Sequence, residues 1–259
     1  MLQLLVHDMT ILLTNDDGVH SEGIRALADA LRPFGDIVVV APRHEASAIG
    51  HALTLRRPLR RETIAPDVYG VDGTPTDCVS IAVATVLRRQ PDLIVSGINK
   101  GWNLGDDVTY SGTVSGALEG ALHGVPSVAV SLQRSRGEFD FGEAARASAA
   151  VVGAVLRQPL PPRTFLNVNV PTGRPKGFRV TVQGRRNHVT TVSERHDPRD
   201  QSYYWIEEGE NFWESHDRSD YKAVMDGYIS VTPLHPDMTA HAALEGIEAL
   251  SFEAPSEVT

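Results

Sequence analysis

The stretch Ile11-Leu12-Leu13-Thr14-Asn15-Asp16-Asp17-Gly18 joins a short apolar run to an amide, two adjacent carboxylates and a glycine. The apolar run predicts a buried strand, and the polar residues then lie at the C-terminal edge of a sheet, where open α/β folds bind ligands. Two neighbouring ionised carboxylates repel each other, and a hard cation such as Mg²⁺, Mn²⁺ or Ca²⁺ would relieve that repulsion. The same residues are common in turns, so the octet alone leaves a turn and a metal site equally open.

The composition is that of an ordinary globular protein. The chain has 259 residues, of which 41% are hydrophobic and 22% charged, which suits one large α/β domain or a core with an appendage. The net charge of −9 lacks the basic footprint of a protein that binds long nucleic acids. With one cysteine, Cys78, and no apolar run near ~18 residues, we expect a cytoplasmic protein that does not span a membrane.

Strand-like and helix-like segments alternate along the first half of the chain. The patterns predict strands over residues 11–14, 37–41, 93–96 and 127–131, and helices over residues 24–31, 75–87 and 115–123. This alternation implies right-handed crossovers and a parallel sheet. Farther on we expect a helix over 144–156 and strands over 164–169, 180–182 and 228–232, while residues 242–250 could be a helix or a strand.

The character of the chain changes near Pro171. We expect residues 1–170 to form the catalytic core, with residues 1–8 a dispensable extension, and residues 171–259 to form a C-terminal oligomerisation extension that returns to the core. Residues 183–220 are too polar to make a core of their own and too aromatic for a plain linker. This favours an extended hairpin that packs on another subunit over a surface loop above the active site.

Three further polar segments have the right character to join the acid pair. They cover residues 42–51, 96–105 and 110–117, and the first two begin where a predicted strand ends, as the acid pair does. Ser111-Gly112-Thr113 precedes a helix, whose free N–H groups and dipole favour phosphate, although ordinary helix capping would use the same residues. Asn103 lies in a glycine-rich loop that is equally ambiguous by itself. The convergence of these segments on one rim favours a functional site.

Other catalytic schemes are poorly supported by the sequence. The chain contains no G-x-S-x-G elbow, no H-E-x-x-H pair and no Walker A loop, and G-x-G-x-x-G is missing after the first predicted strand. Metal-assisted chemistry on an anionic substrate is therefore the best interpretation.

Several motifs in order resemble the SurE family of stationary-phase survival proteins, which are metal-dependent 5′/3′-nucleotidases. The matching blocks are I-L-L-T-N-D-D-G-V-H at 11–20, V-V-A-P…S at 39–47, G-T-P-T-D-C-V at 73–79, S-G-I-N-x-G-x-N-L-G-D-D-V-x-Y-S-G-T-V-S-G-A at 96–117 and G-Y-I-S-V-T-P-L at 227–234. They span nearly the whole chain. One departure is the loop Arg43-His44-Glu45-Ala46, where many relatives are more basic.

The resemblance implies a Rossmann-like three-layer α/β core with a mainly parallel sheet and a C-terminal β-hairpin extension that is swapped between subunits, giving homodimers or homotetramers. It also implies one divalent cation per subunit, Mg²⁺ or Mn²⁺, and a phosphate pocket. The implied metal ligands are Asp16, Asp17, Ser47 and Asn99, and the implied phosphate-binding residues are Asn103, Ser111, Gly112 and Thr113.

The expected reaction is hydrolysis of nucleoside 5′- and 3′-monophosphates to nucleoside and phosphate. A bound metal ion would lower the pKa of a water molecule, and Asp16 or Asp17 could accept its proton. Two alternatives remain. An exopolyphosphatase or broad acid-type phosphatase would use the same segments, and a non-catalytic nucleotide sensor would bind nucleotide without releasing phosphate.

Overall fold

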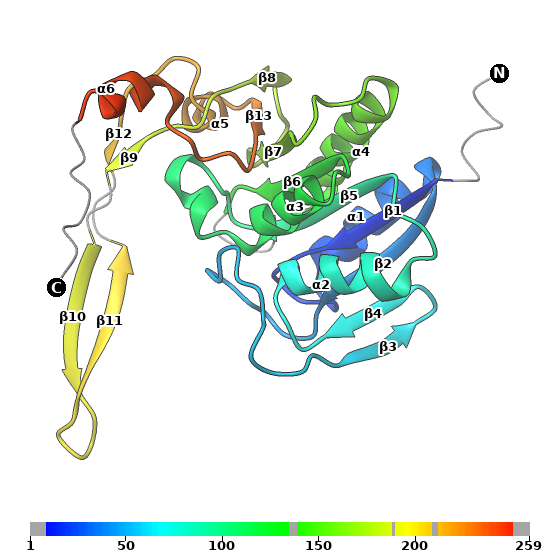
Figure 1. Ribbon diagram of the computed structural model, residues 1–259, viewed down its shortest axis with the longest axis horizontal. Coiled ribbons are helices and arrows are strands. Elements are labelled where there is room, and N and C mark those ends of the chain that lie inside the picture. Colours follow the sequence, from blue (N-terminus) through cyan, green and yellow to red (C-terminus); the bar gives the residue numbers. More distant parts are fainter. Residues whose placement is uncertain (1–8, 135–138, 188–189, 209–211, 251–259) are drawn as a thin grey trace, which may run out of the picture.

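A nine-stranded, mostly parallel sheet forms the centre of the protein (Figure 1). The computed structural model describes residues 9–134, 139–187, 190–208 and 212–250, so the proposed extension at 1–8 lies outside the described residues. The strand order is β3-β4-β2-β1-β5-β6-β7-β13-β8. The strands are β1 (Thr10–Thr14), β2 (Asp36–Pro42), β3 (Arg61–Ala65), β4 (Val68–Val71), β5 (Leu93–Lys100), β6 (Ser127–Leu132), β7 (Phe165–Val170), β8 (Phe178–Val180) and β13 (Ile229–Leu234).

The six strands from β4 to β7 in this order run parallel, whereas β3 and β13 run antiparallel to their neighbours β4 and β7. Helices cover both faces of the sheet. Helices α1 (Glu22–Leu31) and α4 (Gly142–Arg157) pack together on one face, and α2 (Pro75–Ile81) and α3 (Gly112–Leu122) pack together on the other. The predicted three-layer, Rossmann-like architecture is confirmed.

Strand β1 occupies the middle of the sheet because its residues are apolar on both faces. Ile11 and Leu13 pack into the core beneath α1 and α4, and Leu12 packs into the core beneath α2. Since β2 and β5 flank β1 in parallel, their carboxyl ends all lie at one edge of the sheet. The loops that carry the predicted site residues therefore start at the same edge.

Some element boundaries differ from the sequence prediction. The predicted helix over residues 75–87 is α-helical only as far as Ile81, and residues Ala82–Val86 continue it as a π-helical turn, η3. In this β-branched stretch the Thr85 hydroxyl donates a hydrogen bond of 2.8 Å back to the Ile81 carbonyl, a pattern that distorts helices. Helix α3 begins at Gly112 rather than at 115, because Ser111 caps its N-terminus through the Val114 amide.

The strands β3 and β4 were not predicted. Strand β3 is exposed along its whole length and carries Arg61 and Glu62, so its sequence lacks the apolar alternation that marks a strand. In the C-terminal part, the predicted strand at 180–182 is shifted to β8, and residues 242–250 contain a short 3₁₀ turn (His241–Ala243) followed by α6 (Leu244–Glu248). Helix α5 (Asp220–Met225) was also not predicted.

An antiparallel hairpin of β10 (Thr190–His196) and β11 (Ser202–Glu208) extends away from the sheet (Figure 1). Its base adjoins the short pair β9 (Arg186–Asn187) and β12 (Phe212–Trp213). The hairpin expected between residues 183 and 220 is therefore present. No helix in the described part of the chain is long and apolar enough to cross a membrane.

Close packing of α3 on the sheet makes a direct prediction about Gly120. A Cβ atom there would overlap the Ser127 hydroxyl and lie 2.9 Å from Ile94 Cδ1. Gly120→Ala should therefore lower the free energy of unfolding by about 1–3 kcal/mol, although alanine favours helices over glycine. In the control Gly153→Ala on α4, the nearest contacts are side-chain atoms of Arg157 and Phe34 at 3.3 Å, and a much smaller change is expected. Urea unfolding of both variants measures the difference, and equal losses would contradict it.

Candidate active site

The side chain of Asp16 lies against the N-terminus of α3. Its Oδ1 accepts a hydrogen bond from the Thr113 hydroxyl, and only 5% of the residue is exposed. A Cβ atom on Gly112 would lie 2.8 Å from Asp16 Cβ and 2.9 Å from Oδ2, so only glycine lets the helix approach this closely. The helix end therefore places its free N–H groups beside a buried carboxylate.

Burial makes ionisation of both Asp16 and Asp17 less favourable than in water. Burial raises the pKa of Asp16 to about 6, and the neighbouring charge of Asp17 also raises it, while the hydrogen bond from Thr113 opposes the shift. Burial also raises the pKa of Asp17, against the opposing effect of the Lys100 amide and charge. A cation beside these carboxylates would offset the cost of ionising them.

The loop that follows β2 contacts the acid pair through Ala46, the residue before Ser47. The Ala46 amide donates a hydrogen bond of 2.8 Å to the main-chain carbonyl of Asp16, which fixes the neighbouring Ser47 beside β1. The Ser47 hydroxyl itself donates to the Glu45 carboxylate at 2.7 Å.

Asn99 reaches the same edge from the end of β5. The amide of Lys100 donates to Asp17 Oδ2 at 3.2 Å, so Asn99 and Asp17 lie on adjoining strand ends. The Asn99 side-chain nitrogen donates to the Gly101 carbonyl at 3.0 Å. This contact uses the nitrogen of the side-chain amide, and the oxygen is the atom suited to bind a cation.

The four predicted metal ligands together provide two carboxylates, one hydroxyl and one amide oxygen. This all-oxygen set fits a hard divalent cation such as Mg²⁺ or Mn²⁺. Within the described ranges, no three or more His, Cys, Asp and Glu residues cluster in a way that could hold a metal ion. A site at this edge would therefore combine the acid pair with neutral ligands.

Asn103 belongs to a buried amide cluster that sequence reasoning missed. Its side-chain nitrogen donates to Ser131 Oγ at 2.7 Å, and its main-chain amide donates to Asn169 Oδ1 at 2.7 Å. Its carbonyl accepts hydrogen bonds from the side chains of Asn167 and Asn169 at 2.8 and 3.0 Å. Ser131 is the cross-strand partner of Asn99. The amide cluster therefore adjoins the predicted metal ligand Asn99.

A signal for the amide cluster was present in the stretch Phe165-Leu-Asn-Val-Asn-Val170. Two asparagines alternate with valines there, and both are fully buried. Because buried amides are costly unless hydrogen-bonded, alternation of this kind indicates a specific polar partner.

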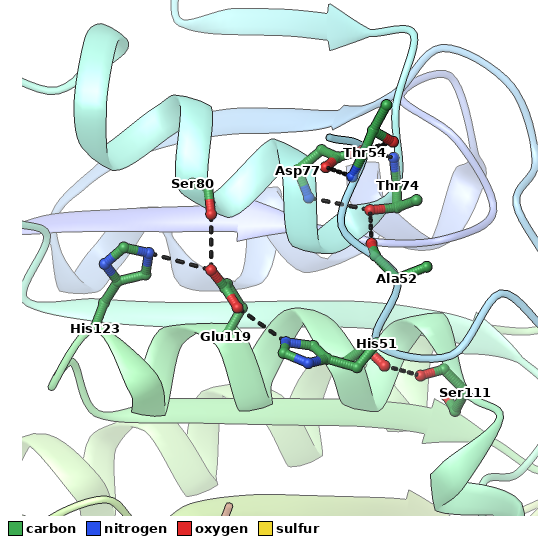
Figure 2. Close-up of polar contacts among 10 residues, drawn as sticks. His51, Ala52, Thr54, Thr74, Asp77, Ser80, Ser111, Glu119 and His123 are labelled. Carbon is green, nitrogen blue, oxygen red and sulfur yellow. Dashed lines mark hydrogen bonds and ion pairs between the residues drawn. The ribbon is translucent and has the colours of Figure 1, made fainter. Parts of the chain in front are cut away.

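Figure 2 shows how the loop after Ser47 is tied to α2 and α3. His51 pairs with Glu119 of α3 at 2.9 Å, and Ser80 of α2 donates to the same carboxylate at 2.7 Å. The amide and hydroxyl of Thr54 donate to Asp77 at 2.8 and 2.7 Å. These contacts fix residues 51–54, and through them the loop that presents Ser47.

A family model, Survival protein SurE, matches residues 11–190. The chain belongs to the SurE family. Two relatives are named 5′-nucleotidase SurE: that of Syntrophotalea carbinolica is 52% identical, covering 94% of this chain and 98% of the relative, and that of Geobacter metallireducens is 49% identical with the same coverage. The crystal structure of the SurE protein from Aquifex aeolicus is 46% identical, with a TM-score of 0.82 over 92% of this chain and 98% of that one.

One SurE motif, Gly73-Thr-Pro-Thr-Asp-Cys-Val79, has a structural explanation in this chain. Thr74 caps α2 and Asp77 completes a reciprocal capping box, with Pro75 in the first turn. Asp77 also binds the loop at Thr54. This SurE block thus serves to start a helix and to hold a loop.

The buried carboxylate of Asp16 makes a prediction about stability and pH. Since its folded-state pKa lies near 6 rather than at the ordinary 3.8, its contribution to stability is fully present below about pH 4 and is lost as the pH rises through 6. In metal-free protein, Asp16→Asn should therefore be more stable than the wild type at pH 7–8, by roughly 2–3 kcal/mol, and the gain should shrink below pH 4.

Urea unfolding in EDTA at several pH values measures this effect. Asp36→Asn, which removes an exposed carboxylate from β2, is the matched control for loss of charge. An Asp16→Asn variant that is no more stable than the wild type at pH 7–8 would show that Asp16 is not strained by burial.

Proposed function

We propose that this SurE-family protein is a metal-dependent phosphomonoesterase that hydrolyses nucleoside 5′- and 3′-monophosphates to nucleoside and phosphate. The observation that carries the proposal is the buried Asp16 carboxylate, hydrogen-bonded to Thr113 at the N-terminus of α3. A cation site and an anion site then adjoin, which is what metal-assisted transfer of a phosphoryl group requires. The name 5′-nucleotidase, carried by relatives about half identical to this chain, supports a nucleotide substrate.

The proposed ligands of one divalent cation per subunit, Mg²⁺ or Mn²⁺, are Asp16, Asp17, Ser47 and Asn99. When bound, such an ion neutralises charge on phosphoryl oxygens and makes a water molecule easier to deprotonate. The side chains bring only oxygen atoms to this set, and two of them are carboxylates whose pKa values burial raises.

The phosphate pocket would use the start of α3. Ser111 accepts a hydrogen bond from the Val114 amide at 3.1 Å and also contacts His51 (Figure 2), and in the proposed pocket its hydroxyl would donate to a phosphate oxygen instead. The amides of Gly112 and Thr113 belong to the first helical turn, whose N–H groups have no intrahelical acceptor. Asn103 orients the phosphate from the neighbouring loop, and either Asp16 or Asp17 accepts the proton of the attacking water.

Removal of the acid or of the metal tests this function. Asp16→Asn should lower kcat/KM for 5′-AMP by about 10²–10⁴-fold, since it removes both a ligand and a possible base, and EDTA should abolish phosphate release by the wild type. Release of orthophosphate measures both effects, and far-ultraviolet circular dichroism checks the fold. Asp36→Asn serves again as control, and full activity in metal-free buffer would refute the proposal.

A substrate panel separates the alternatives. The wild type is assayed on 5′-AMP, 5′-GMP, 3′-mononucleotides and polyphosphate, each with Mg²⁺, Mn²⁺ or Ca²⁺. A nucleotidase releases phosphate from mononucleotides in preference to polyphosphate, and the reverse order indicates an exopolyphosphatase. Tight mononucleotide binding with no phosphate release indicates a nucleotide sensor.

We further propose that residues 1–170 act as the catalytic core and residues 171–259 as an oligomerisation extension of a homodimer or homotetramer, located in the cytoplasm. The hairpin supports an assembly role because a two-stranded hairpin alone is at best marginally stable in water. One face carries the cross-strand partners Val192 and Ile206, which are 55% and 79% exposed, and the other face carries Trp205. A second copy of the chain would cover these side chains.

Charge placed on the hairpin should reduce the assembled mass. We expect Ile206→Glu to shift the protein toward a smaller species in size-exclusion chromatography with light scattering, because it would bury a charge in the contact. Leu55→Glu, at an exposed apolar residue outside the hairpin, is the control. An unchanged mass for Ile206→Glu would exclude the hairpin from the interface.

A further inference from the structure

Asp220 is a fully buried carboxylate between the C-terminal extension and the glycine-rich loop that follows Asn103. Its Oδ2 accepts a hydrogen bond of 2.8 Å from the amide of Gly105. Its Oδ1 accepts hydrogen bonds from the amides of Gly184 and Tyr221, at 2.9 and 2.7 Å. One side chain thus joins main-chain atoms of two segments that are far apart in the sequence.

Burial of the Asp220 carboxylate disfavours its charged form. Burial raises the pKa of Asp220, and the amides of Gly105, Gly184 and Tyr221 oppose the shift. The N–H groups directed at the carboxylate stabilise its charged form and compensate for its burial. Its location therefore requires a fixed arrangement of the two segments.

The surrounding contacts leave the loop little freedom. Gly105 has φ of +53°, and a Cβ atom there would lie 2.6 Å from the Trp213 ring and 2.8 Å from the Gly184 carbonyl. The Gln183 side chain donates to the Gly105 carbonyl at 3.1 Å. Substituting Gly105 itself would disturb all these contacts at once, so the role of Asp220 is better tested at Asp220.

Two further contacts extend the same junction. The Arg186 guanidinium binds Asp107 at 3.0 Å, and the Arg186 amide donates to Asp106 at 3.1 Å. Tyr221 stacks on Trp213 with ring centroids 4.2 Å apart and meets Trp102 edge-on at 6.1 Å. Residues 102–107 are therefore held by residues 183–186, Trp213 and residues 220–221, and the pair β9–β12 among them adjoins the base of the β10–β11 hairpin (Figure 1).

The held loop connects two parts of the phosphate pocket. It begins beside Asn103 and leads through the 3₁₀ turn η4 (Gly105–Thr109) to Ser111, the N-cap of α3. Asp16 and Asp17, in contrast, follow β1 at the middle of the sheet. A change at Gly105 should thus displace Asn103 and Ser111, while the contact of Asp16 with Thr113 keeps the acid pair in place.

We propose that Asp220 is a positioning residue that sets the phosphate pocket by fixing Gly105, and that it couples the C-terminal extension to that pocket. This inference rests on the proposed function for the identity of the phosphate site. Asp220 touches no substrate in this scheme, and it acts through Asn103 and Ser111.

Asp220→Asn tests the proposal with little change in shape. Loss of charge-assisted hydrogen bonds should raise KM for 5′-AMP and the inhibition constant of orthophosphate together, by about 10–100-fold, with a smaller change in kcat. The Mg²⁺ or Mn²⁺ concentration for half-maximal activation should stay the same. Asp226→Asn is the matched control, since this carboxylate lies at the end of the same helix but pairs with Arg179 and Lys222. It should leave every one of these constants unchanged.

A second variant and a second readout cover the case in which Asp220→Asn does not fold. Gln183→Ala removes one exposed donor to the Gly105 carbonyl, and it should raise the orthophosphate constant by about 3–10-fold. Hydrogen exchange of residues 102–107, followed by mass spectrometry, should be faster in both variants than in Asp226→Asn.

The outcomes separate the two proposals. If the wild type releases no phosphate, the proposed function fails, and the role of Asp220 is decided by exchange at residues 102–107 and by orthophosphate binding. Folded Asp220→Asn or Gln183→Ala protein with wild-type exchange and a wild-type orthophosphate constant would overturn the positioning role. A wild-type KM with an altered metal requirement would also overturn it.

Discussion

The contact between Asp16 and the N-terminus of α3 is the constraint on which the rest of the site depends. It joins the end of the central strand to the first turn of a helix, and Gly112 allows the approach because no Cβ atom fits there. The close distance removes water from the carboxylate and raises its pKa. The same distance places N–H groups of the helix where an anion would adjoin a cation. One packing contact therefore determines both the electrostatics and the layout of the rim.

The fold was largely predictable because its central strands are short apolar runs that end in polar, glycine-containing loops. Ile11–Leu13 of β1 are buried on both faces, as the run suggested. The sequence prediction missed only local features. Strand β3 is exposed and polar, so nothing in its own sequence distinguishes it from a loop. The π-turn after α2 is closed by a hydrogen bond from the Leu87 amide to the Ala82 carbonyl, which apolar periodicity does not report.

The position of the rim loops was also predictable from the sequence, because loops that follow parallel strands lie at one edge of the sheet. The ligand and phosphate roles assigned to Asp16, Asp17, Ser47, Asn99 and the 111–113 turn remain predictions. The residues that hold the site loops in place could not be predicted from the sequence. Asn167 and Asn169 act on a loop more than 60 residues earlier, and Asp220 acts on Gly105 across 115 residues. Such pairings are set by the fold as a whole, since no local pattern in the chain specifies them.

The long separation between Gly105 and Asp220 has a consequence for biosynthesis. A nascent chain that has emerged as far as Leu132 already contains β1, β2, β5, β6 and α3, and therefore both halves of the Asp16–Thr113 contact. It still lacks the amides on β7 that hold Asn103 and the carboxylate that holds Gly105. The acid pair can thus reach its place early, while the loop beside it becomes fixed only after the chain has been synthesised as far as Asp220. Completion of the rim becomes a late step in the maturation of each molecule.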